Sequence, residues 1–564
     1  MRNDLAATGV LSAMELDTLD RVVREPDEPL VNALLKSGIV PEEKLLQALA
    51  QALRIGFTRL GENEIDPAVC ARVPTKAVFQ YNVMPMRMEG DCLLVAASNP
   101  FNLPMLECLR MAAGARIRLV LSPQADILKS LKRYYGVGAD TLDQLIQKNV
   151  VDLDMTGGTI TKQDVANDDQ EASVVKFVNQ IIAEAYKERS TDIHLEPMEN
   201  DLRIRYRVDG ALHQVPVPPQ LKRFQAAIIS RIKVMASMDI AERRLPQDGR
   251  INVRSGGTEI DVRVSTIPTA YGESVSLRLL TRNSIFLGLE KLGFNHDDET
   301  IIRRLVELPH GIILVTGPTG SGKSTSLYAF LSTINSIDQR IITIEEPIEY
   351  ELPGVNQMQV RSDIGLTFAS GLRHILRQDP DVIMVGEIRD LETAEIAIRA
   401  ALTGHLVFST LHTNDAAGAV TRLLDMGIEP FLVSSSVEAI IAQRLVRTLC
   451  PACKAAYTPE PELLNEVGFP SAREGVTFYR ATGCEECRFT GYRGRMGIYE
   501  TLVLRENLRP LIIERASSSV IKQAACANGM KTLRDDGWVK VRAGLTTVEE
   551  VARVTHEDEA LVAS

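Results

Sequence analysis

The stretch GIILVTGPTGSGKSTSLYAF, residues 311–330, decides the fold of this 564-residue chain. Residues 317–324 fit the pattern G-x-x-x-x-G-K-[ST], which average composition would produce by chance in a chain of this length roughly once in 50. An apolar run, residues 311–316, precedes the motif and a helical pattern follows it. This is the strand–loop–helix setting that a phosphate-binding loop requires, and it disfavours the alternative of a glycine-rich turn with an exposed lysine.

The chemistry of such a loop follows from its residue types. Glycines let backbone N–H groups turn inward around phosphate oxygens at the positive end of a helix. Lys323 is predicted to neutralise the β- and γ-phosphates of ATP, and the Ser324 hydroxyl is predicted to hold Mg²⁺. The predicted nucleotide-binding residues are Gly317, Pro318, Thr319, Gly320, Ser321, Gly322, Lys323, Ser324 and Thr325.

Three more apolar runs further along the chain end in functional groups. Residues 341–344 lead into Glu345, Glu346 and Glu349, residues 382–385 lead into Glu387, and residues 406–411 lead into His412. Short apolar runs bounded by breakers and alternating with helices predict a mainly parallel sheet that is covered on both faces. A single acid at a strand end is more often a solvated charge. Several such groups beside one phosphate-binding loop favour a role in polarising the attacking water or binding Mg²⁺.

Four cysteines form two C-x-x-C pairs, Cys450 with Cys453 and Cys484 with Cys487. Each pair supplies half of a tetrahedral Zn²⁺ site, and four protein ligands make a closed, structural site. A pair of disulfides is the competing interpretation, which a reducing compartment disfavours. The other four cysteines are predicted to be buried apolar fillers; they are Cys70, Cys92, Cys108 and Cys526.

The length and composition limit the possible classes of protein. A chain of 564 residues predicts three or four domains, and 45% hydrophobic with 24% charged residues is typical of a globular protein. The net charge of −11 argues against a non-specific nucleic-acid binder. We find no run of 18 apolar residues and no apolar core of a signal peptide at the start, and therefore expect a cytoplasmic protein.

The chain before the phosphate-binding loop divides by pattern. Residues 1–150 mix amphipathic helices with strands such as the apolar run 92–97, and residues 151–172 are polar and predict a linker. A second domain, 173–282, begins with a helix whose apolar face is Val174, Phe177, Val178, Ile181, Ile182 and Ala185. Strict alternation over 201–210 then predicts a strand with Arg203, Arg205 and Arg207 on one side. A hairpin at about 251–264 completes a compact α+β module.

At the motifs around the phosphate-binding loop the chain resembles the secretion ATPase superfamily, the motors of type II secretion and type IV pilus assembly. Four motifs occur in the family's order. The likeness covers about 400 residues, and beyond these motifs it includes DIHLEP (192–197), RYRVDG (205–210), LPQDGRI (245–251) and VRVSTIP (262–268). The four are the Walker A loop GPTGSGKST (317–325), the Asp box TIEEPIEY (343–350), the Walker B stretch DPDVIMVGEIRD (379–390) and the His box LTGHLVFSTLHT (402–413).

The resemblance implies a fold and a domain plan. It implies a RecA-like motor domain with a mainly parallel sheet (283–564), which includes a tetracysteine zinc module (450–497). An α+β, PAS-like domain (173–282) precedes it, after an N-terminal α/β docking domain (1–150) and the linker 151–172. The motor would be a homohexamer with ATP bound between protomers.

The resemblance also implies catalytic roles. Glu387 and Glu345 would organise Mg²⁺ and the attacking water, His412 would sense the γ-phosphate, and Arg205 would act as an arginine finger. Glu346 stands where the family usually has Asp, so either of the two neighbouring acids could act. The family's second arginine falls on Gln220, and Lys222 or Arg223 could substitute for it.

The N-terminal region resembles a docking domain that binds the cytoplasmic part of an inner-membrane platform protein, which implies peripheral association with that membrane. Related domains of some pilus motors bind cyclic di-GMP through a motif that begins Arg-Leu-Gly. The comparable stretch here, Pro29-Leu30-Val31, lacks the arginine and the glycine, which favours a helical docking surface.

The leading functional hypothesis is the ATPase that drives pseudopilus assembly in type II secretion. The amino-acid sequence of the zinc module is most similar to that of this motor. The stretches concerned are AQRLVRTLCPAC (442–453), ATGCEEC (481–487) and GYRGRMGIYE (491–500). The extension motor of a type IV pilus is the alternative. A DNA-translocating ATPase is disfavoured by the acidic balance, and a scaffold with a vestigial ATPase is disfavoured by the intact Lys323, Ser324 and Glu387.

Overall fold

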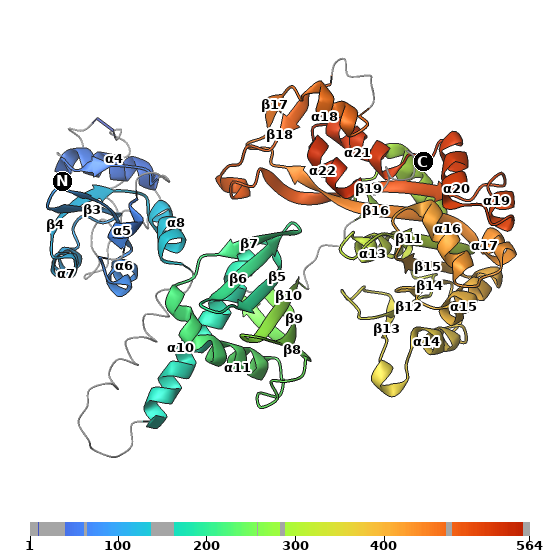
Figure 1. The fold of residues 1–564 in the computed structure, drawn as a ribbon, viewed down its shortest axis with the longest axis horizontal. Coiled ribbons are helices and arrows are strands. Elements are labelled where there is room, and N and C mark those ends of the chain that lie inside the picture. Colours follow the sequence, from blue (N-terminus) through green and yellow to red (C-terminus); the bar gives the residue numbers. More distant parts are fainter. Residues whose placement is uncertain are drawn as a thin grey trace. The chain divides into compact units, whose positions relative to one another are not determined.

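A computed structural model describes residues 9–10, 40–60, 65–70, 72–136, 163–255, 258–281, 288–469 and 476–555 (Figure 1). The chain divides into two compact units, Met1–Thr281 and Arg282–Ser564. The second unit begins one residue before 283, where the motor domain is predicted to start. The stretch Pro29-Leu30-Val31 and most of the predicted linker lie outside the described residues.

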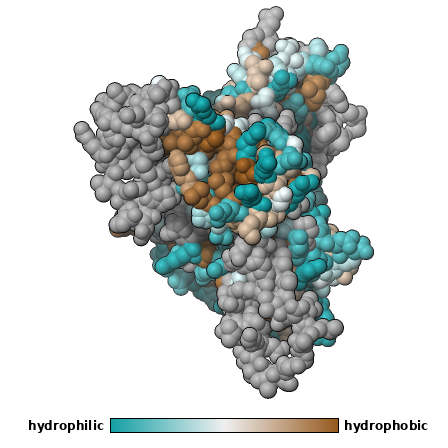
Figure 2. Space-filling model, turned by 90° about the vertical axis from the view of Figure 1, so that its left-hand side faces the viewer, coloured by the Kyte–Doolittle hydropathy of each residue, from teal (hydrophilic) through white to brown (hydrophobic). Residues whose placement is uncertain are grey.

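The N-terminal domain contains a four-stranded sheet in the order β1-β4-β3-β2, in which only β2 and β3 pair antiparallel. The predicted apolar strand is β3, whose residues 93–97 are all buried. Figure 2 looks onto this domain, and hydrophobic side chains gather in a patch on the face it shows. The elements are α4 (Glu42–Leu53), β1 (Gly56–Phe57), α5 (Pro67–Cys70), α6 (Thr75–Tyr81), β2 (Val83–Glu89), β3 (Cys92–Ala97), α7 (Leu103–Ala113), β4 (Arg116–Leu121) and α8 (Gln124–Tyr135).

The α+β domain is an antiparallel sheet in the order β7-β6-β5-β10-β9-β8 with helices α10 and α11. All six predicted apolar residues of α10 are buried in the core of this domain. The helix begins at Gln163, so residues 163–172, predicted as linker, are helical; a helix that is nucleated on a packed face extends by one hydrogen bond per residue. The elements are α10 (Gln163–Lys187), β5 (Ser190–Pro197), β6 (Leu202–Val208), β7 (Ala211–Val215), η2 (Pro219–Phe224), α11 (Gln225–Met235), β8 (Gln247–Ser255), β9 (Thr258–Thr269) and β10 (Gly272–Thr281).

The second unit is built on a seven-stranded sheet in the order β13-β12-β14-β15-β11-β16-β19, parallel except for the β16–β19 pair. The four predicted core strands are present, and every residue in them is buried. Helices cover both faces of the sheet around two apolar clusters (Figure 1). The strands are β11 (Gly311–Thr316), β12 (Ile341–Glu345), β13 (Asn356–Gln359), β14 (Val382–Val385), β15 (Leu406–Leu411), β16 (Val437–Leu449) and β19 (Tyr492–Val503).

Because β11, β12, β14 and β15 are parallel neighbours in this sheet, their carboxyl ends meet at one edge, where the predicted functional groups follow them. A small module with strands β17 (Ala455–Tyr457) and β18 (Phe478–Arg480), helix α18 (Pro461–Glu466) and η5 (Glu485–Cys487) lies between β16 and β19 in the chain. In the described part of the chain, no helix is long and apolar enough to cross a membrane. The remaining helices are η3 (Leu289–Lys291), α12 (His296–Val306), α13 (Lys323–Ile334), η4 (Ser362–Ile364), α14 (Phe368–Ile375), α15 (Leu391–Leu402), α16 (Ala416–Asp425), α17 (Pro430–Ser436), α19 (Arg509–Ile513), α20 (Ser518–Ala527), α21 (Leu533–Arg542) and α22 (Val548–Thr555).

Candidate nucleotide and metal sites

The phosphate-binding loop connects β11 to the first residue of α13, Lys323. Gly320 and Gly322 have φ of 80° and 93°, a region that favours glycine, and a Cβ on Gly317 would lie 2.5 Å from the Gln443 carbonyl oxygen. The Ser321 hydroxyl is buried without a hydrogen-bond partner among the described residues, so it is available to a phosphate oxygen. These backbone demands explain why the motif needs its glycines.

Lys323 folds back over the loop. Its Nζ donates to the carbonyl oxygens of Gly317, at 2.7 Å, and Pro318, at 3.1 Å. The pKa of Lys323 is lowered to about 8, mainly by burial; the charge of Glu387 opposes the shift, and that of Arg444 adds to it. The ammonium group is therefore held at the mouth of the loop with two weak acceptors, and a phosphate would be a stronger partner.

An acid cluster faces this edge of the sheet. Glu387 follows β14, and its Oε2 lies 3.2 Å from Nε2 of His412, which follows β15. The other Glu387 oxygen pairs with Arg389, whose second nitrogen lies 3.0 Å from Glu346 Oε2. The hydrogen bond to Glu387 raises the pKa of Arg389. The structure thus brings together the predicted Glu387 and His412 and joins Glu346 to them through an arginine.

Glu345 occupies a different environment from Glu346, although the two are adjacent in sequence. It is 4% exposed, and its oxygens accept hydrogen bonds from the Tyr328 hydroxyl, from Thr343 Oγ1 at 2.5 Å and from Gln357 Nε2 at 3.0 Å. All three donors are neutral. Successive side chains at the end of a strand point to opposite sides, so Glu345 enters the core under α13 while Glu346 meets Arg389.

Three functional candidates were not predicted from the sequence. Arg389 stands two residues after Glu387 in the Walker B stretch, and this spacing was the available signal. Gln443 and Arg444 lie on β16, beside the loop: Gln443 Oε1 accepts from Ser326 Oγ at 2.8 Å, and the Arg444 guanidinium donates to the Asn414 carbonyl oxygen at 3.0 Å. The stretch 442–453 contains both residues but indicates only the zinc module, because β16 reaches the loop only through its pairing with β11.

Arg205 lies on β6 of the first unit, where it forms an ion pair with Glu196. Arg203 bonds the same carboxylate at 2.8 Å. Of the suggested substitutes for a second arginine, Lys222 donates its Nζ to the Met198 carbonyl oxygen. The role of Arg205 toward a nucleotide stays a prediction.

The four predicted metal ligands converge where the two ends of the module between β16 and β19 meet. The Sγ atoms of Cys450, Cys453, Cys484 and Cys487 lie within 4.8 Å of one another, with three separations of 3.7–3.8 Å. Four sulfurs about 2.3 Å from a central Zn²⁺ would be separated by about 3.8 Å. The separations therefore fit a tetrahedral tetrathiolate site, whereas a disulfide needs about 2.05 Å.

The backbone also prepares this cluster for a thiolate. The N–H groups of Cys484 and Gly491 donate to Cys487 Sγ at 3.1 and 3.2 Å. Among the other four cysteines, Cys70 is buried as predicted, but Cys526 is exposed, so the prediction of an apolar filler was wrong there. Its helix, α20, lies on the surface with only Ile521 and Ala525 buried.

Comparison with known proteins covers nearly the whole chain. The family described as Type II/IV secretion system protein matches residues 167–553, and the MshEN domain matches residues 53–141. The type IV pilus assembly ATPase PilB of Myxococcus xanthus is 42% identical over 98% of this chain and 98% of its own length. The type II secretion system ATPase E of Vibrio cholerae is 48% identical over 80% of this chain and 90% of its own length.

Two further comparisons concern a second type II secretion protein and the fold. The type II secretion system protein E of Pseudomonas aeruginosa is 53% identical over 70% of this chain and 78% of its own length. Among solved structures, the Legionella pneumophila ATPase DotB has a TM-score of 0.51 at 21% identity and covers 68% of this chain and 96% of its own length. At this identity the likeness supports the fold alone, and it agrees with the predicted RecA-like motor.

Proposed function

The chain belongs to the Type II/IV secretion system protein family, and we propose that it powers type II protein secretion by driving pseudopilus assembly at an inner-membrane platform. Membership makes it an ATPase of a secretion or pilus system, which uses ATP and Mg²⁺. One observation carries the catalytic part of the proposal. The phosphate-binding loop with Lys323 shares a sheet edge with the Glu387–His412 pair.

The geometry suggests a separate role for each of these residues in hydrolysis. Lys323 would exchange its two carbonyl acceptors for phosphate oxygens, and Ser324 would bind Mg²⁺. Glu387 would polarise the attacking water, with His412 fixing the orientation of its carboxylate. Arg389 pairs with one Glu387 oxygen, so in the proposed mechanism Arg389 would release that oxygen for Glu387 to act on the water.

For assembly, we propose a homohexamer in which Arg205 completes a nucleotide site. Arg205 is held by a carboxylate that it shares with Arg203, so its guanidinium is preorganised on a strand. The N-terminal domain would bind the cytoplasmic part of the platform and so hold the motor at the inner membrane. Large apolar side chains on this domain support docking: Met111 is 85% and Leu103 69% exposed.

We propose that the tetracysteine cluster holds one structural Zn²⁺. All four ligands come from the protein, which leaves no open coordination position for chemistry. The ligands join the end of β16 to the turn before β19, so the metal would tie together both ends of the inserted module. Its contribution would be folding free energy of this module.

The pilus alternative has its own support, because the Myxococcus relative matches 98% of the chain, including the N-terminal region. Type II secretion is favoured by the 53% identity to the Pseudomonas protein over 70% of this chain. Both assignments predict the same ATPase. They differ in the fibre that is assembled.

Gene deletion in the native host separates the two systems. For type II secretion, we expect exported enzymes to accumulate in the periplasm while surface pili remain, and wild-type protein but not the Lys323→Ala variant to restore export. Loss of surface pili with unchanged export would assign the chain to pilus assembly. In purified protein, Lys323→Ala should reduce phosphate release below about a tenth of wild type with unchanged circular dichroism, because a transition-state contact is lost.

A further inference from the structure

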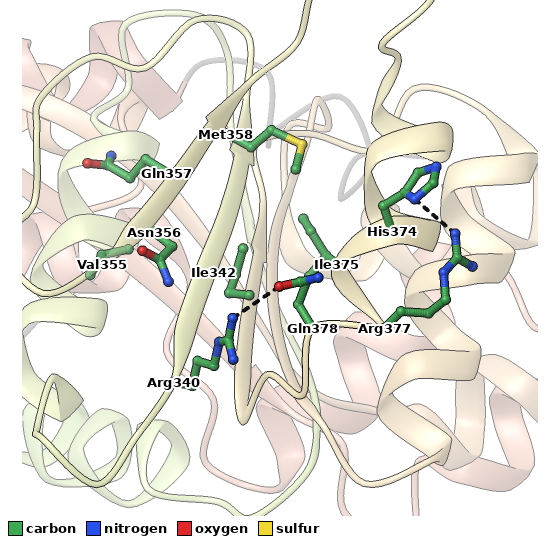
Figure 3. Close-up of a pocket in the computed structure, with 10 residues that line it drawn as sticks. All are labelled: Arg340, Ile342, Val355, Asn356, Gln357, Met358, His374, Ile375, Arg377 and Gln378. Atoms are coloured by element: carbon green, nitrogen blue, oxygen red, sulfur yellow. Dashed lines mark hydrogen bonds between the residues drawn. The ribbon is translucent and has the colours of Figure 1, made fainter.

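A pocket of about 510 Å³ lies at the edge of the ATPase sheet, between β13 and α14 (Figure 3). Its floor includes Ile342 and Ile375, which are buried, and the partly buried Met358. Arg340 precedes β12, whereas the acid cluster follows the carboxyl ends of β12 and β14. The pocket therefore lies away from the phosphate-binding loop and plays no part in the hydrolysis derived above.

The polar lining of this pocket is basic. It contains Arg340, Arg377 and His374 and no carboxylate. Arg340 donates to the Gln378 amide oxygen at 3.1 Å, and Arg377 donates to His374 Nδ1 at 2.9 Å (Figure 3). Within the described ranges, neither guanidinium forms an ion pair. Two fixed positive charges beside an apolar floor are suited to acidic side chains on a partner.

The pocket also adjoins an open sheet edge. β13 stands at the end of the strand order, and in the described part of the chain it pairs with β12 alone. Such an edge offers backbone N–H and C=O groups that can pair with an extended segment. Side chains of an added strand point alternately to the two faces, so every second residue would face α14.

We propose that an extended segment of a different protein docks here as a strand beside β13, with acidic side chains at alternate positions that meet Arg340 and Arg377. The apolar floor would accept a small hydrophobic side chain. The backbone pairing supplies affinity, and the arginines supply selectivity for acids.

The chain's own edge strands do not have this pattern. β2, β8 and β19 each carry one acid, namely Glu89, Asp248 and Glu500, and β1, β7, β17 and β18 carry none. No edge strand of the described sheets therefore presents two acids at alternate positions. This disfavours edge-to-edge pairing between the described strands of two copies, and a different polypeptide is the proposed occupant.

Docking at β13 would also reach the catalytic edge, a consequence that rests on the proposed function. Figure 3 places Gln357 on the other side of the strand from the residues of α14. Its side chain bonds Glu345 at 3.0 Å and the Tyr350 carbonyl oxygen at 2.9 Å. A partner that rigidifies β13 therefore restrains the strand end that leads to Glu346.

Binding is tested without ATP, so failure of the proposed function would leave the result interpretable. The probe is a fluorescein-labelled nonapeptide of alternating Glu and Val, titrated with the full-length protein and followed by fluorescence anisotropy. The variants are the Arg340→Ala/Arg377→Ala double mutant and, as a matched control, Arg373→Ala. Arg373 lies on α14, which borders the pocket, but its guanidinium pairs with Glu392 at 2.5 Å. A Lys–Val peptide and a Glu–Pro peptide, which cannot pair as a strand, complete the set.

We expect the Glu–Val peptide to bind wild type and Arg373→Ala equally and the double variant at least tenfold more weakly. The Lys–Val and Glu–Pro peptides should bind weakly to all three. Equal binding to wild type and the double variant, equal binding of the Glu–Pro peptide, or no binding to wild type would overturn the proposal. Loss of oligomers by the double variant in sedimentation analysis, with no peptide binding to wild type, would instead assign this edge to contacts between copies.

Discussion

Nε2 of Gln357 lies 3.0 Å from Oε1 of Glu345, so the edge strand β13 holds the acid that ends its neighbour β12. Tyr328 adds a second link, because its hydroxyl donates to Glu345 and accepts from the backbone N–H of Glu349 at 3.1 Å. Gln357 likewise accepts from the backbone N–H of Leu352 at 2.7 Å. The buried carboxylate thus anchors the loop that carries Glu346.

This relationship predicts what the Glu345→Gln variant does. In this variant an NH₂ group replaces one carboxylate oxygen and would face a hydrogen-bond donor. We therefore expect the free energy of unfolding of the ATPase unit to fall by about 1–3 kcal/mol. Glu346→Gln is the matched control and should leave stability unchanged, because Glu346 is exposed and pairs only across the surface. Thermal unfolding and phosphate release are measured together. Normal stability with turnover lost in Glu345→Gln would instead support a direct catalytic role for Glu345.

The pKa of Lys323 predicts a pH dependence of nucleotide binding. Burial lowers this pKa to about 8, and a bound phosphate would raise it again. At a pH between the pKa of Lys323 in the free protein and its pKa in the bound protein, nucleotide binding takes up a proton. Nucleotide affinity should therefore fall as the pH rises above 8, by up to tenfold per pH unit. Calorimetric titration with ADP at pH 7 and pH 9, in buffers of different ionisation enthalpy, measures both effects. Unchanged affinity and no proton uptake at pH 9 would contradict the buried environment of Lys323.

Arg205 is predicted to act at a nucleotide site, and mixing tests whether that site belongs to another protomer. Arg205→Ala should lose most ATP turnover, while Arg254→Ala, whose exposed guanidinium pairs with Glu259, should not. Mixed rings of Arg205→Ala and Lys323→Ala protein should recover part of the activity, since some sites combine an intact arginine with an intact loop. Absence of recovery at every mixing ratio, with mixed rings demonstrated, would argue that Arg205 does not act in trans.

The thiolate cluster predicts about one zinc per chain by elemental analysis. Cys484→Ser should release the metal and make residues 450–497 sensitive to protease, because the ends of the module lose their link. Cys526 is exposed, so Cys526→Ser is the control and should keep both the metal and the resistance to protease. Nucleotide binding should persist in both variants, since the phosphate-binding loop lies on separate strands. A zinc-free wild-type protein with a Cys450–Cys484 disulfide would refute a metal site.

The sequence by itself determined the elements with strong local signals. The strand–loop–helix around Lys323 was predictable because the phosphate-binding loop needs glycines at fixed positions, which the φ values of Gly320 and Gly322 explain. The core strands were predictable because a strand covered on both faces is apolar throughout. The spacing of Cys450, Cys453, Cys484 and Cys487 predicted that these four cysteines come together. Glu387 and His412 followed from their places at strand ends.

Only the tertiary structure decided which charges meet. Glu345 and Glu346 are indistinguishable as neighbouring acids, but strand alternation buries one under Tyr328 and turns the other toward Arg389. Gln443 and Arg444 reach the loop because β16 pairs with β11, more than 120 residues earlier in the chain, and no local pattern encodes that register. Long-range pairing of strands is selected by packing of the whole sheet, so the partners of these side chains depend on the fold and not on their own segment.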